Sequence, residues 1–341
     1  AQNFTTATST FNTAVGYAAG AAVTTGLQNT LIGGLAGDAL TDADKNVAIG
    51  YGALSTDTLG SRSVAIGTFA LEDQNFTTAT DAYNTAVGNA AGANVTTGLY
   101  NTLIGGLAGD AITTGDHNVT LGVSALTSNT AANKNVAIGS NSLSVFNVTS
   151  DTDTYNTAVG YGAGQQVTTA TNNTLIGGLA GDAITTGNDN TAVGGSALTT
   201  NITGTNNVAM GVSALKLNTG SNNTAIGRGA LLNQAAGSDN TAVGKDAGND
   251  ITTGVKNTLI GALAGDALTD ADSNVAVGRA ALSTDTLGSC SVAIGRNALI
   301  VQNFTTATDS FNTAVGDRAG TAVTTGVQNT IVGGLAGDAI T

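Results

Sequence analysis

The stretch NTLIGGLAGDA stands at residues 29–39 and returns unchanged at 101–111 and 173–183. Two close variants follow, NTLIGALAGDA at 257–267 and NTIVGGLAGDA at 329–339. A glycine-rich turn that ends in an aspartate resembles a phosphate cradle, but a P-loop also needs a Lys and a following helix, and the stretch has neither. Five copies in one chain indicate a structural repeat rather than a single site.

A shorter phrase, N-[TV]-[ALTI]-[VILM]-G-x-x-A, underlies these copies and occurs nineteen times. Most copies begin 17 residues after the previous one, with three intervals of 21 and one of 16. The first position is Asn except at Ser63 and Ser291, the fifth is always Gly, and the eighth is Ala except at Ser142. Larger repeats, most of them 72 residues long, begin near residues 12, 84, 156, 240 and 312.

This repeat predicts an all-β fold, a parallel β-solenoid of about nineteen 17-residue coils that runs as one domain through residues 1–341. Side chains alternate along a strand, so the second and fourth positions should share one face and the third should take the other. The fifth-position Gly permits positive φ or close approach of a neighbouring backbone. The leading Asn is expected to bond local backbone groups and to stack on its equivalent one coil away.

The ninth and twelfth positions of the phrase compensate for each other. Where the ninth is Gly, as at Gly37, the twelfth is Val, Leu or Ile, as at Leu40. Where the ninth is Leu, as at Leu54, the twelfth is polar in eight of nine coils, with Phe146 as the exception. Each coil therefore supplies one large side chain from one of two places, and a void or an extra side chain would cost roughly 1–3 kcal/mol.

Composition excludes several classes of protein. With 48 Gly, no Pro, no Trp and 4% aromatic residues, the usual core of large side chains is excluded. The net charge of −13 argues against nucleic-acid binding, which needs clustered Lys and Arg. No run approaches the roughly 18 apolar residues of a membrane span. One cysteine, Cys290, rules out an intramolecular disulfide framework.

The chain begins with Ala1 inside a repeat and shows no signal peptide, so we expect a segment of a longer, extracellular chain. Ala at the third and eighth positions is interpreted as a surface feature that lets several copies pack side by side. On this interpretation the chain forms a parallel homo-oligomer, most simply a trimer.

The phrases SVAIGTFAL (63–71), NVAIGYGAL (46–54) and NTAVGYAAG (12–20) resemble the head repeats of trimeric autotransporter adhesins, the YadA-like family. Similar repeats occur in phage and bacterial tail-fibre proteins. The resemblance covers nearly the whole chain and implies a left-handed β-roll in a trimeric fibre used for attachment. The 17-residue period departs from the shorter period of adhesin heads, which favours the tail-fibre branch.

Few residues suggest chemistry. His117 and Cys290 occupy the position before the leading Asn, a varied and mostly polar column that we expect to face solvent. The pairs Asp42 with Asp44, Asp151 with Asp153, and Asp270 with Asp272 lie in Ser/Thr-rich turns. They are interpreted as solvated turn residues, with weak Ca²⁺ binding and the paired carboxylates of a glycosidase as alternatives. No catalytic residue and no cofactor are expected.

The longer coils carry the best binding candidates. They contain QNFTTATDAY (74–83), VFNVTSDTDTY (145–155) and QNFTTATDSF (302–311). Aromatic side chains on loops of a rigid scaffold often contact sugars or proteins, although they can also clamp a loop onto its own coil. The candidates for a partner-binding surface are Phe76, Tyr83, Phe146, Tyr155, Phe304 and Phe311.

These patterns favour a non-enzymatic structural and attachment fibre, the shaft or head of a surface adhesin or tail fibre on a cell or virion surface. Its partners would be further copies of itself and a cell-surface glycan or protein receptor. A solenoid that binds or depolymerises polysaccharide is the first alternative. An ice- or mineral-binding solenoid is the second, although the Thr residues form no continuous rank along the chain.

Overall fold

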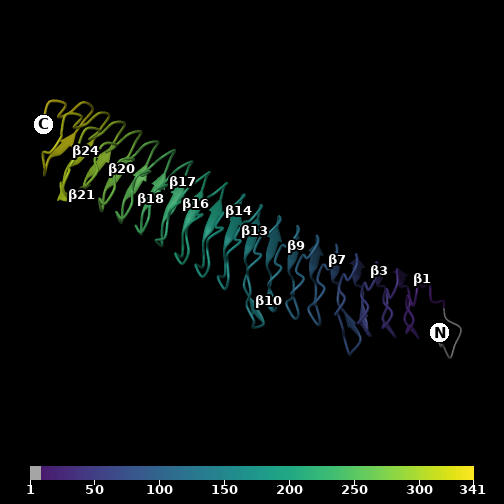
Figure 1. Ribbon diagram of the computed structural model, residues 1–341. Coiled ribbons are helices and arrows are strands. Elements are labelled where there is room, and N and C mark those ends of the chain that lie inside the picture. Colours follow the sequence, from purple (N-terminus) through teal and green to yellow (C-terminus); the bar gives the residue numbers. More distant parts are fainter. Residues whose placement is uncertain (1–8) are drawn as a thin grey trace. The chain divides into compact units, whose positions relative to one another are not determined.

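The computed structural model describes residues 9–341, and these form a parallel β-solenoid of about nineteen turns with no helix (Figure 1). The predicted fold class is thus confirmed. The chain divides into two compact units, Ala1–Asn172 (unit 1) and Asn173–Thr341 (unit 2). Each unit is described by itself below.

Unit 1 contains one strand of three residues in each coil and two pairs of additional two-residue strands. The coil strands are β1 (Thr13–Val15), β2 (Thr30–Ile32), β3 (Val47–Ile49), β5 (Val64–Ile66), β7 (Thr85–Val87), β8 (Thr102–Ile104), β9 (Val119–Leu121), β11 (Val136–Ile138) and β13 (Thr157–Val159). The additional strands are β4 (Gly60–Ser61), β6 (Thr80–Asp81), β10 (Ala132–Asn133) and β12 (Thr152–Asp153).

Unit 2 has the same plan, but with a single pair of additional two-residue strands. Its coil strands are β14 (Thr174–Ile176), β15 (Thr191–Val193), β16 (Val208–Met210), β17 (Thr224–Ile226), β18 (Thr241–Val243), β19 (Thr258–Ile260), β20 (Val275–Val277), β22 (Val292–Ile294), β24 (Thr313–Val315) and β25 (Thr330–Val332). The additional strands are β21 (Gly288–Ser289) and β23 (Thr308–Asp309).

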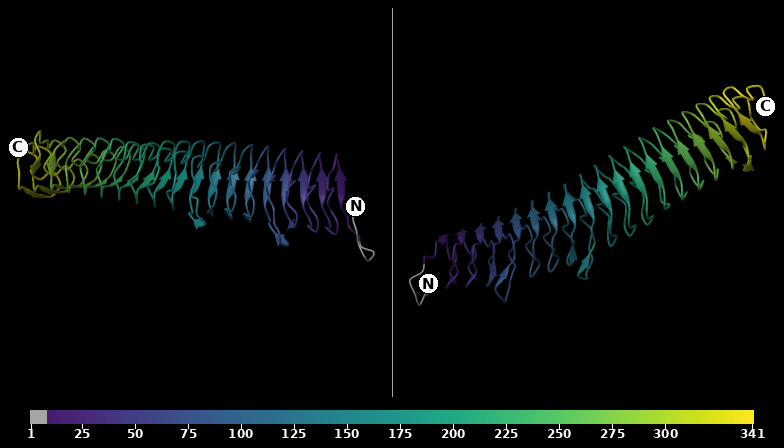
Figure 2. Two further views of the ribbon diagram at one scale, coloured as in Figure 1. Left: turned by 60° about the horizontal axis from the view of Figure 1, so that its bottom comes forward. Right: turned by 180° about the vertical axis from the view of Figure 1, so that it is seen from behind.

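Within each unit, the strands of neighbouring coils pair in parallel, and equivalent positions face each other. Thr30, for example, lies opposite Val47, and Leu31 lies opposite Ala48. The longer coils add one short parallel pair each, β4 with β6, β10 with β12, and β21 with β23. Figure 2 shows the longer turns of unit 1 extending beyond their neighbours.

The strands alternate as predicted. From β2 onward the third-position side chains are buried, whereas the second and fourth positions are partly or fully exposed. The eighth-position side chain is also buried, as Ala36 and Ala53 illustrate. Our interpretation of the third- and eighth-position Ala as surface residues was therefore wrong. Small side chains are needed there because both positions point into the interior of the chain's own coil.

The invariant fifth-position Gly forms a ladder in which each residue lies against the next. Its φ is positive in every coil, for example +136° at Gly33. A Cβ at Gly33 would come within 2.4 Å of the Gly50 carbonyl oxygen. Both predicted reasons for glycine therefore apply, the dihedral angle and the approach of a neighbouring backbone.

The leading Asn residues form a second, buried ladder. The backbone N–H of Asn46 donates to Oδ1 of Asn29 (2.9 Å), and Nδ2 of Asn29 donates to the Ala43 carbonyl (2.7 Å). The same pattern recurs in unit 2, where the N–H of Asn274 donates to Oδ1 of Asn257 (3.0 Å). Each Asn thus joins two coils and closes the turn that precedes the next coil, as predicted.

The compensation between the ninth and twelfth positions is confirmed, with one addition. Leu40 and Leu54, from the two types of coil, are both fully buried. A Cβ at Gly37 would lie 2.7 Å from Cδ1 of Leu40 and 2.8 Å from Cδ2 of Leu31. Coils with Leu or Ile at the third position therefore bury a second large side chain, which the one-per-coil rule missed. Phe146 is fully buried beside Leu143.

The polar twelfth-position residues also lie inside, where they form hydrogen-bonded relays. Nε2 of Gln74 donates to Oδ2 of Asp57 (2.7 Å) and to Oγ of Ser63 (2.9 Å). Oε1 of Gln74 accepts from Nδ2 of Asn84 (2.9 Å). Ser at position 63, in place of Asn, thus provides the hydroxyl that Gln74 bonds. Burial raises the pKa of Asp57 above its ordinary value.

Candidate functional site: outward-facing columns and a polar groove

The structure divides the six aromatic candidates of the longer coils into two groups. Phe146 is fully buried, and Phe76 and Phe304 are each 6% exposed. Phe76 and Phe304 pack over Gly60 and Gly288, where an added Cβ atom would lie 2.7 Å from the ring in each case.

Phe76 and Phe304 therefore hold the longer turns against the preceding coil, and Phe146 is enclosed in the interior. The other three, Tyr83, Tyr155 and Phe311, are about half exposed, at 47%, 53% and 54%. Only this second group has surface available to a partner.

Tyr83 belongs to a column formed by the residue before each leading Asn, which we call the pre-Asn column. Its members have positive φ, for example +51° at Tyr83 and +57° at His117. The ring of Tyr100 stacks on Tyr83 (centroids 5.8 Å apart) and on His117 (4.7 Å). The guanidinium of Arg62 lies over the Tyr83 ring, 5.5 Å from its centroid. Four successive coils thus form one continuous stack.

The second long coil of unit 1 repeats the cation–ring arrangement. Nζ of Lys134 lies 5.3 Å from the Tyr155 ring centroid and forms an ion pair with Asp153. Arg62 pairs in the same way with Asp81 (2.8 Å). Because ring faces and cations are already in contact with each other, the stack offers ring edges and hydroxyl groups rather than open faces.

The predicted Asp pairs are engaged by neighbouring coils. Asp42 accepts from the Thr25 hydroxyl (2.5 Å) and Asp44 from the Leu27 N–H (2.7 Å). Asp270 and Asp272 accept the equivalent bonds from Thr253 (2.5 Å) and Val255 (2.7 Å).

The third pair is also bonded. Nδ2 of Asn133 donates to Asp151 (2.7 Å), and Nζ of Lys134 donates to Asp153 (2.5 Å). Within residues 9–341, no three His, Cys, Asp or Glu side chains are grouped so that they could hold a metal ion.

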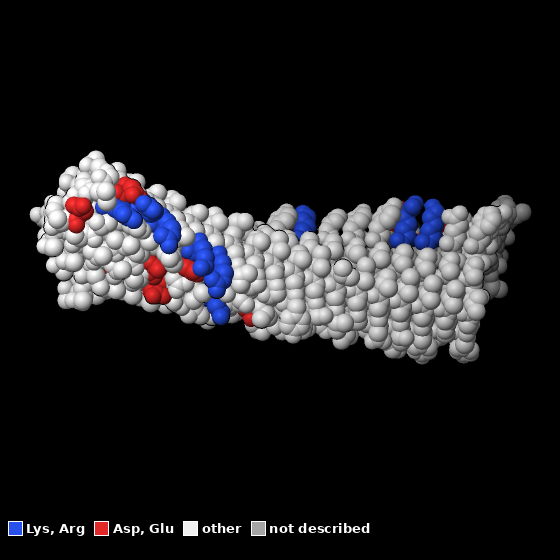
Figure 3. Space-filling view, turned by 90° about the horizontal axis from the view of Figure 1, so that it is seen from above, with Lys and Arg blue, Asp and Glu red and all other residues white. Residues whose placement is uncertain are grey.

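A second column, at the sixth position of the phrase, differs between the units. In unit 1 it includes Tyr17, Tyr51 and Tyr161, all exposed. In unit 2 it becomes cationic. We call the following five exposed residues the basic column: Arg228, Lys245, Arg279 and Arg296 at the sixth position and Arg318 at the seventh. Figure 3 shows Lys and Arg side chains gathered on this face of unit 2, with Asp among them.

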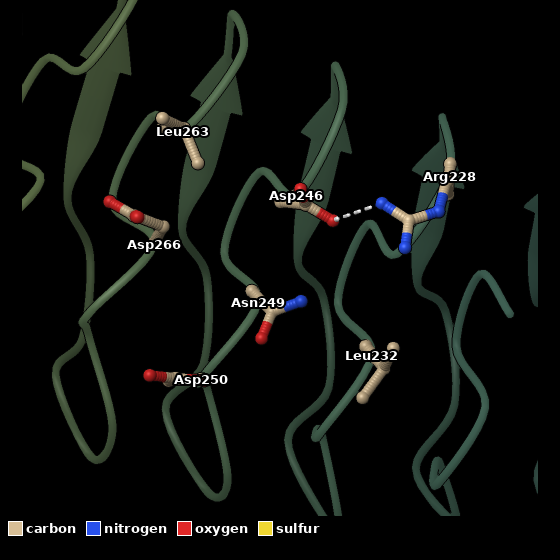
Figure 4. Close-up of a pocket in the computed structure, with 7 residues that line it drawn as sticks. All are labelled: Arg228, Leu232, Asp246, Asn249, Asp250, Leu263 and Asp266. Carbon is tan, nitrogen blue, oxygen red and sulfur yellow. Dashed lines mark ion pairs between the residues drawn. The ribbon is translucent and has the colours of Figure 1, made fainter.

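A groove of about 360 Å³ lies beside the basic column and spans three coils. Figure 4 shows Arg228 at one side, Asp266 at the other and Asn249 between them. Its lining residues follow β17, β18 and β19 and are Arg228, Leu232, Asp246, Asn249, Asp250, Leu263 and Asp266.

Hydrogen bonds and ion pairs within the protein engage only some of the polar atoms that line the groove. Asn249 donates to the Gly229 carbonyl (3.2 Å), and Asp246 lies 3.9 Å from Arg228 and 3.4 Å from Lys245. Gly229 is required here, because a Cβ would lie 2.4 Å from Oδ1 of Asp246. Oδ1 of Asp266, in contrast, is shielded from solvent and has no hydrogen-bond partner.

The electrostatics of Asp266 follow from this position. Desolvation, together with the nearby carboxylates of Asp250 and Asp246, raises its pKa above the ordinary value. The groove therefore combines a cation at its edge with carboxylate and amide oxygens that can accept from hydroxyl groups.

Sequence reasoning did not identify the groove or the basic column. The signal for the column was present, because four of the ten Lys and Arg residues occupy the sixth position of coils in residues 223–296. The groove has no such signal, since residues 228, 249 and 266 come from three different coils and only their stacking brings them together.

Comparisons with protein-family models, with curated proteins and with solved structures gave no match for this chain. The likeness to adhesin heads and tail fibres therefore stays a prediction from the repeat phrases. In residues 9–341, no helix has the length and apolar character that crossing a membrane requires.

Proposed function

We propose that this chain is a segment of a non-enzymatic structural and attachment fibre, in which several copies, most simply three, lie side by side. As in the adhesin and tail-fibre proteins that its repeats resemble, it would project binding surfaces from a cell or virion surface toward a host cell or matrix. The observation that supports this proposal best is the uncovered outer face of the coil strands.

That face is apolar in each unit. The second and fourth positions of the coil strands hold only Thr, Val, Ile, Leu and Met, with no charged residue. The fourth-position side chains remain substantially exposed, for example 47% at Leu121 and 40% at Ile260. Parallel sheets are normally covered on both faces, and large exposed apolar patches mark interaction surfaces. A second copy would cover this face with side chains of the same kind.

The contact between copies is thus proposed at the Val and Ile columns rather than at the Ala positions that suggested oligomers from the sequence. Those Ala residues are buried within the coil and are unavailable to another chain. The columns that point elsewhere, the pre-Asn and sixth-position columns, would stay accessible for attachment.

The oligomeric state tests this proposal directly. Light scattering of the purified chain should give the mass of three copies. Ile226→Asp with Ile260→Asp, two exposed fourth-position changes in unit 2, should yield monomers with an unchanged circular dichroism spectrum. The control is Ala235→Asp with Ala236→Asp, two exposed turn positions in the same unit. A monomeric wild-type chain would refute the assembly.

The non-enzymatic part of the proposal has its own test. Acidic and neutral polysaccharides incubated with the chain should release no new reducing ends. If release occurs and Asp266→Asn or Asp250→Asn abolishes it, the chain is a depolymerase and the proposal of a purely structural role is wrong.

A further inference from the structure

The basic column stands out against the charge of the rest of the molecule. The protein carries a net charge of −13, yet five of its ten Lys and Arg residues fall in this one column. Parallel strands are about 4.8 Å apart, so equivalent side chains in neighbouring coils repeat at that spacing. Cations occupy the sixth position in the coils that begin at 223, 240, 274 and 291, which makes an almost continuous line.

Internal ion pairs neutralise only part of this line. Asp246 lies against Arg228 and Lys245, and Asp317 pairs with Arg296 (2.8 Å). Arg279 and Arg318 are exposed, and within residues 9–341 neither has a carboxylate close enough for an ion pair. The five cations exceed the two carboxylates that pair with them, while Asp250 and Asp266 add negative charge at the groove end of the column only.

The groove adds a different chemistry at one end of the same column. Arg228 belongs to both features, and beyond it the groove presents the carboxylates of Asp250 and Asp266. Oδ1 of Asp250 already accepts from Nδ2 of Asn233 (3.1 Å), and Asp266 is partly exposed at the side of the groove away from Arg228 (Figure 4). A ligand that fits both features needs negative charges at about the coil spacing and hydroxyl groups close beside them.

We propose that the basic column and the adjoining groove bind an acidic polysaccharide, a chain of sugar rings that carry carboxylates. The carboxylates would lie along Lys245, Arg279 and Arg296, and the hydroxyl groups of one or two rings would enter the groove and donate to Asp266 and Asp250. A volume of about 360 Å³ is sufficient for a ligand of that size. This inference rests on the proposed attachment function and names its partner.

Two other anionic partners fit less well. A nucleic acid carries one charge per roughly 1.7 Å of duplex, and a protein of net charge −13 repels so dense a polyanion over long range. An acidic face of a second copy would bring Asp side chains that already accept hydrogen bonds from neighbouring coils, as Asp42 and Asp270 do. The combination of exposed cations with the carboxylates that line the groove favours a polymer that is itself both anionic and rich in hydroxyl groups.

The first experiment asks whether binding depends on the cations of the basic column or only on the total charge of the protein. Polygalacturonate is the probe, and its affinity for the whole chain is measured by biolayer interferometry at low and moderate salt. Arg228→Gln with Lys245→Gln and Arg279→Gln should weaken binding at least about tenfold. Lys45→Gln with Lys216→Gln and Lys256→Gln is the control, because it removes three exposed cations elsewhere and should change affinity little.

The second experiment tests the groove. Asp266→Ala should weaken binding of polygalacturonate several-fold while leaving polyacrylate, an anionic polymer without hydroxyl groups, unchanged or bound more tightly. The matched control is Asp182→Ala, which occupies the same position of the phrase and also has an unpartnered Oδ1, but does not line the groove. It should affect neither polymer.

Several outcomes would overturn the proposal. These are no binding of polygalacturonate by the wild-type chain, equal weakening by both triple variants, or tighter binding of a single-stranded oligonucleotide. If the column variant instead changes the mass in light scattering, the column is a contact between copies. The mass of the wild-type chain in light scattering tests the proposed oligomer separately. A monomeric chain that binds polygalacturonate would refute the oligomer and leave the polysaccharide site standing.

Discussion

The segments around residues 46–100 and 274–328 have closely similar interiors, in which only Ala82 and Gly52 are replaced, by Ser310 and Ala280, and different surfaces. Gln74 donates to Asp57 at 2.7 Å, and its counterpart Gln302 donates to Asp285 at 2.6 Å. Outside, Arg62 is replaced by Cys290, whose Sγ lies 3.8 Å from Oδ1 of Asp309.

The aromatic members of the stack change as well. The counterparts of Tyr83 and Tyr100 are Phe311 and Gln328, and the sixth-position Tyr51 becomes Arg279. The comparison indicates that stability of the coils depends on a constant interior, and that each outward column can be varied independently of it.

The largest effect is expected where the interior admits no change. A Cβ at Gly67 would lie 2.2 Å from the Gly88 carbonyl oxygen, and a Cβ at Gly295 equally close to that of Gly316. Either Gly→Ala change should destabilise its unit by about 3 kcal/mol or more, from overpacking and a left-handed backbone together. Guanidinium unfolding of the two variants measures this.

The matched control for these glycines is Gly178→Ala, where a Cβ would meet no atom within 4 Å. Its midpoint should stay close to that of the wild-type chain. If Gly67→Ala and Gly295→Ala lowered the free energy of unfolding by clearly different amounts, the conclusion that the two units have closely similar interiors would be contradicted.

The buried relays come next. Gln74→Leu leaves Oδ2 of Asp57 without its donor, and Gln302→Leu does the same for Asp285. An unpaired buried acceptor typically costs about 1–3 kcal/mol, and more for a charged group. Equal shifts of the unfolding midpoint in the two variants would support the comparison, whereas a loss confined to one unit would show that the relays differ in strength.

A smaller effect concerns pH. Burial raises the pKa of Asp57, so the folded chain holds this proton more tightly than the unfolded chain does. The resulting stabilisation is complete below the ordinary pKa and is lost as the pH rises through the raised one. Asp57→Asn should therefore flatten the fall in stability between acidic and neutral pH. Asp73→Asn, at an exposed position, should preserve the wild-type slope.

The smallest effects should come from exchanging Arg62 and Cys290, the equivalent surface residues of the two segments. Arg62→Cys removes the ion pair with Asp81 and the contact with Tyr83, and Cys290→Arg places a guanidinium between Asp309 and Phe311. Hydrogen exchange should become several-fold faster in the turn at 74–83 and slower in the turn at 302–311. Global unfolding midpoints should barely move, since exposed pairs contribute little. A large change in either unfolding midpoint would mean that these surface contacts also stabilise the interior.

Much of the fold could be predicted because the constant positions of the repeat correspond to residues in the interior. The leading Asn, the fifth-position Gly and the alternation between the ninth and twelfth positions each reflect one contact that every coil makes with the next. The direction in which Ala faces could not be predicted, since a small residue suits a crowded interior and a close interface equally well. Ala48 proved to be interior.

The polar twelfth residues show a second limit. Asp57 and Asn129 would be placed at a surface by polarity alone, yet both are buried because backbone N–H groups and neighbouring amides satisfy them. The candidate groove shows a third, since Arg228 and Asp266 belong to coils two apart and their proximity depends on register. Asp266 belongs to the recurring LAGDA phrase and Arg228 belongs to the sixth-position column, but neither pattern shows that the two residues line one groove.

All variation in coil length falls between the twelfth position and the next leading Asn. The coil that begins at Asn207 is one residue short there, and Nδ2 of Asn207 still reaches the carbonyl of Gly220 (3.0 Å). The long coil that begins at Ser63 gains its additional residues in the same place and keeps its strand in register with the next. This single turn therefore acts as an insertion point, where a foreign peptide could be displayed at chosen intervals without altering the coils on either side.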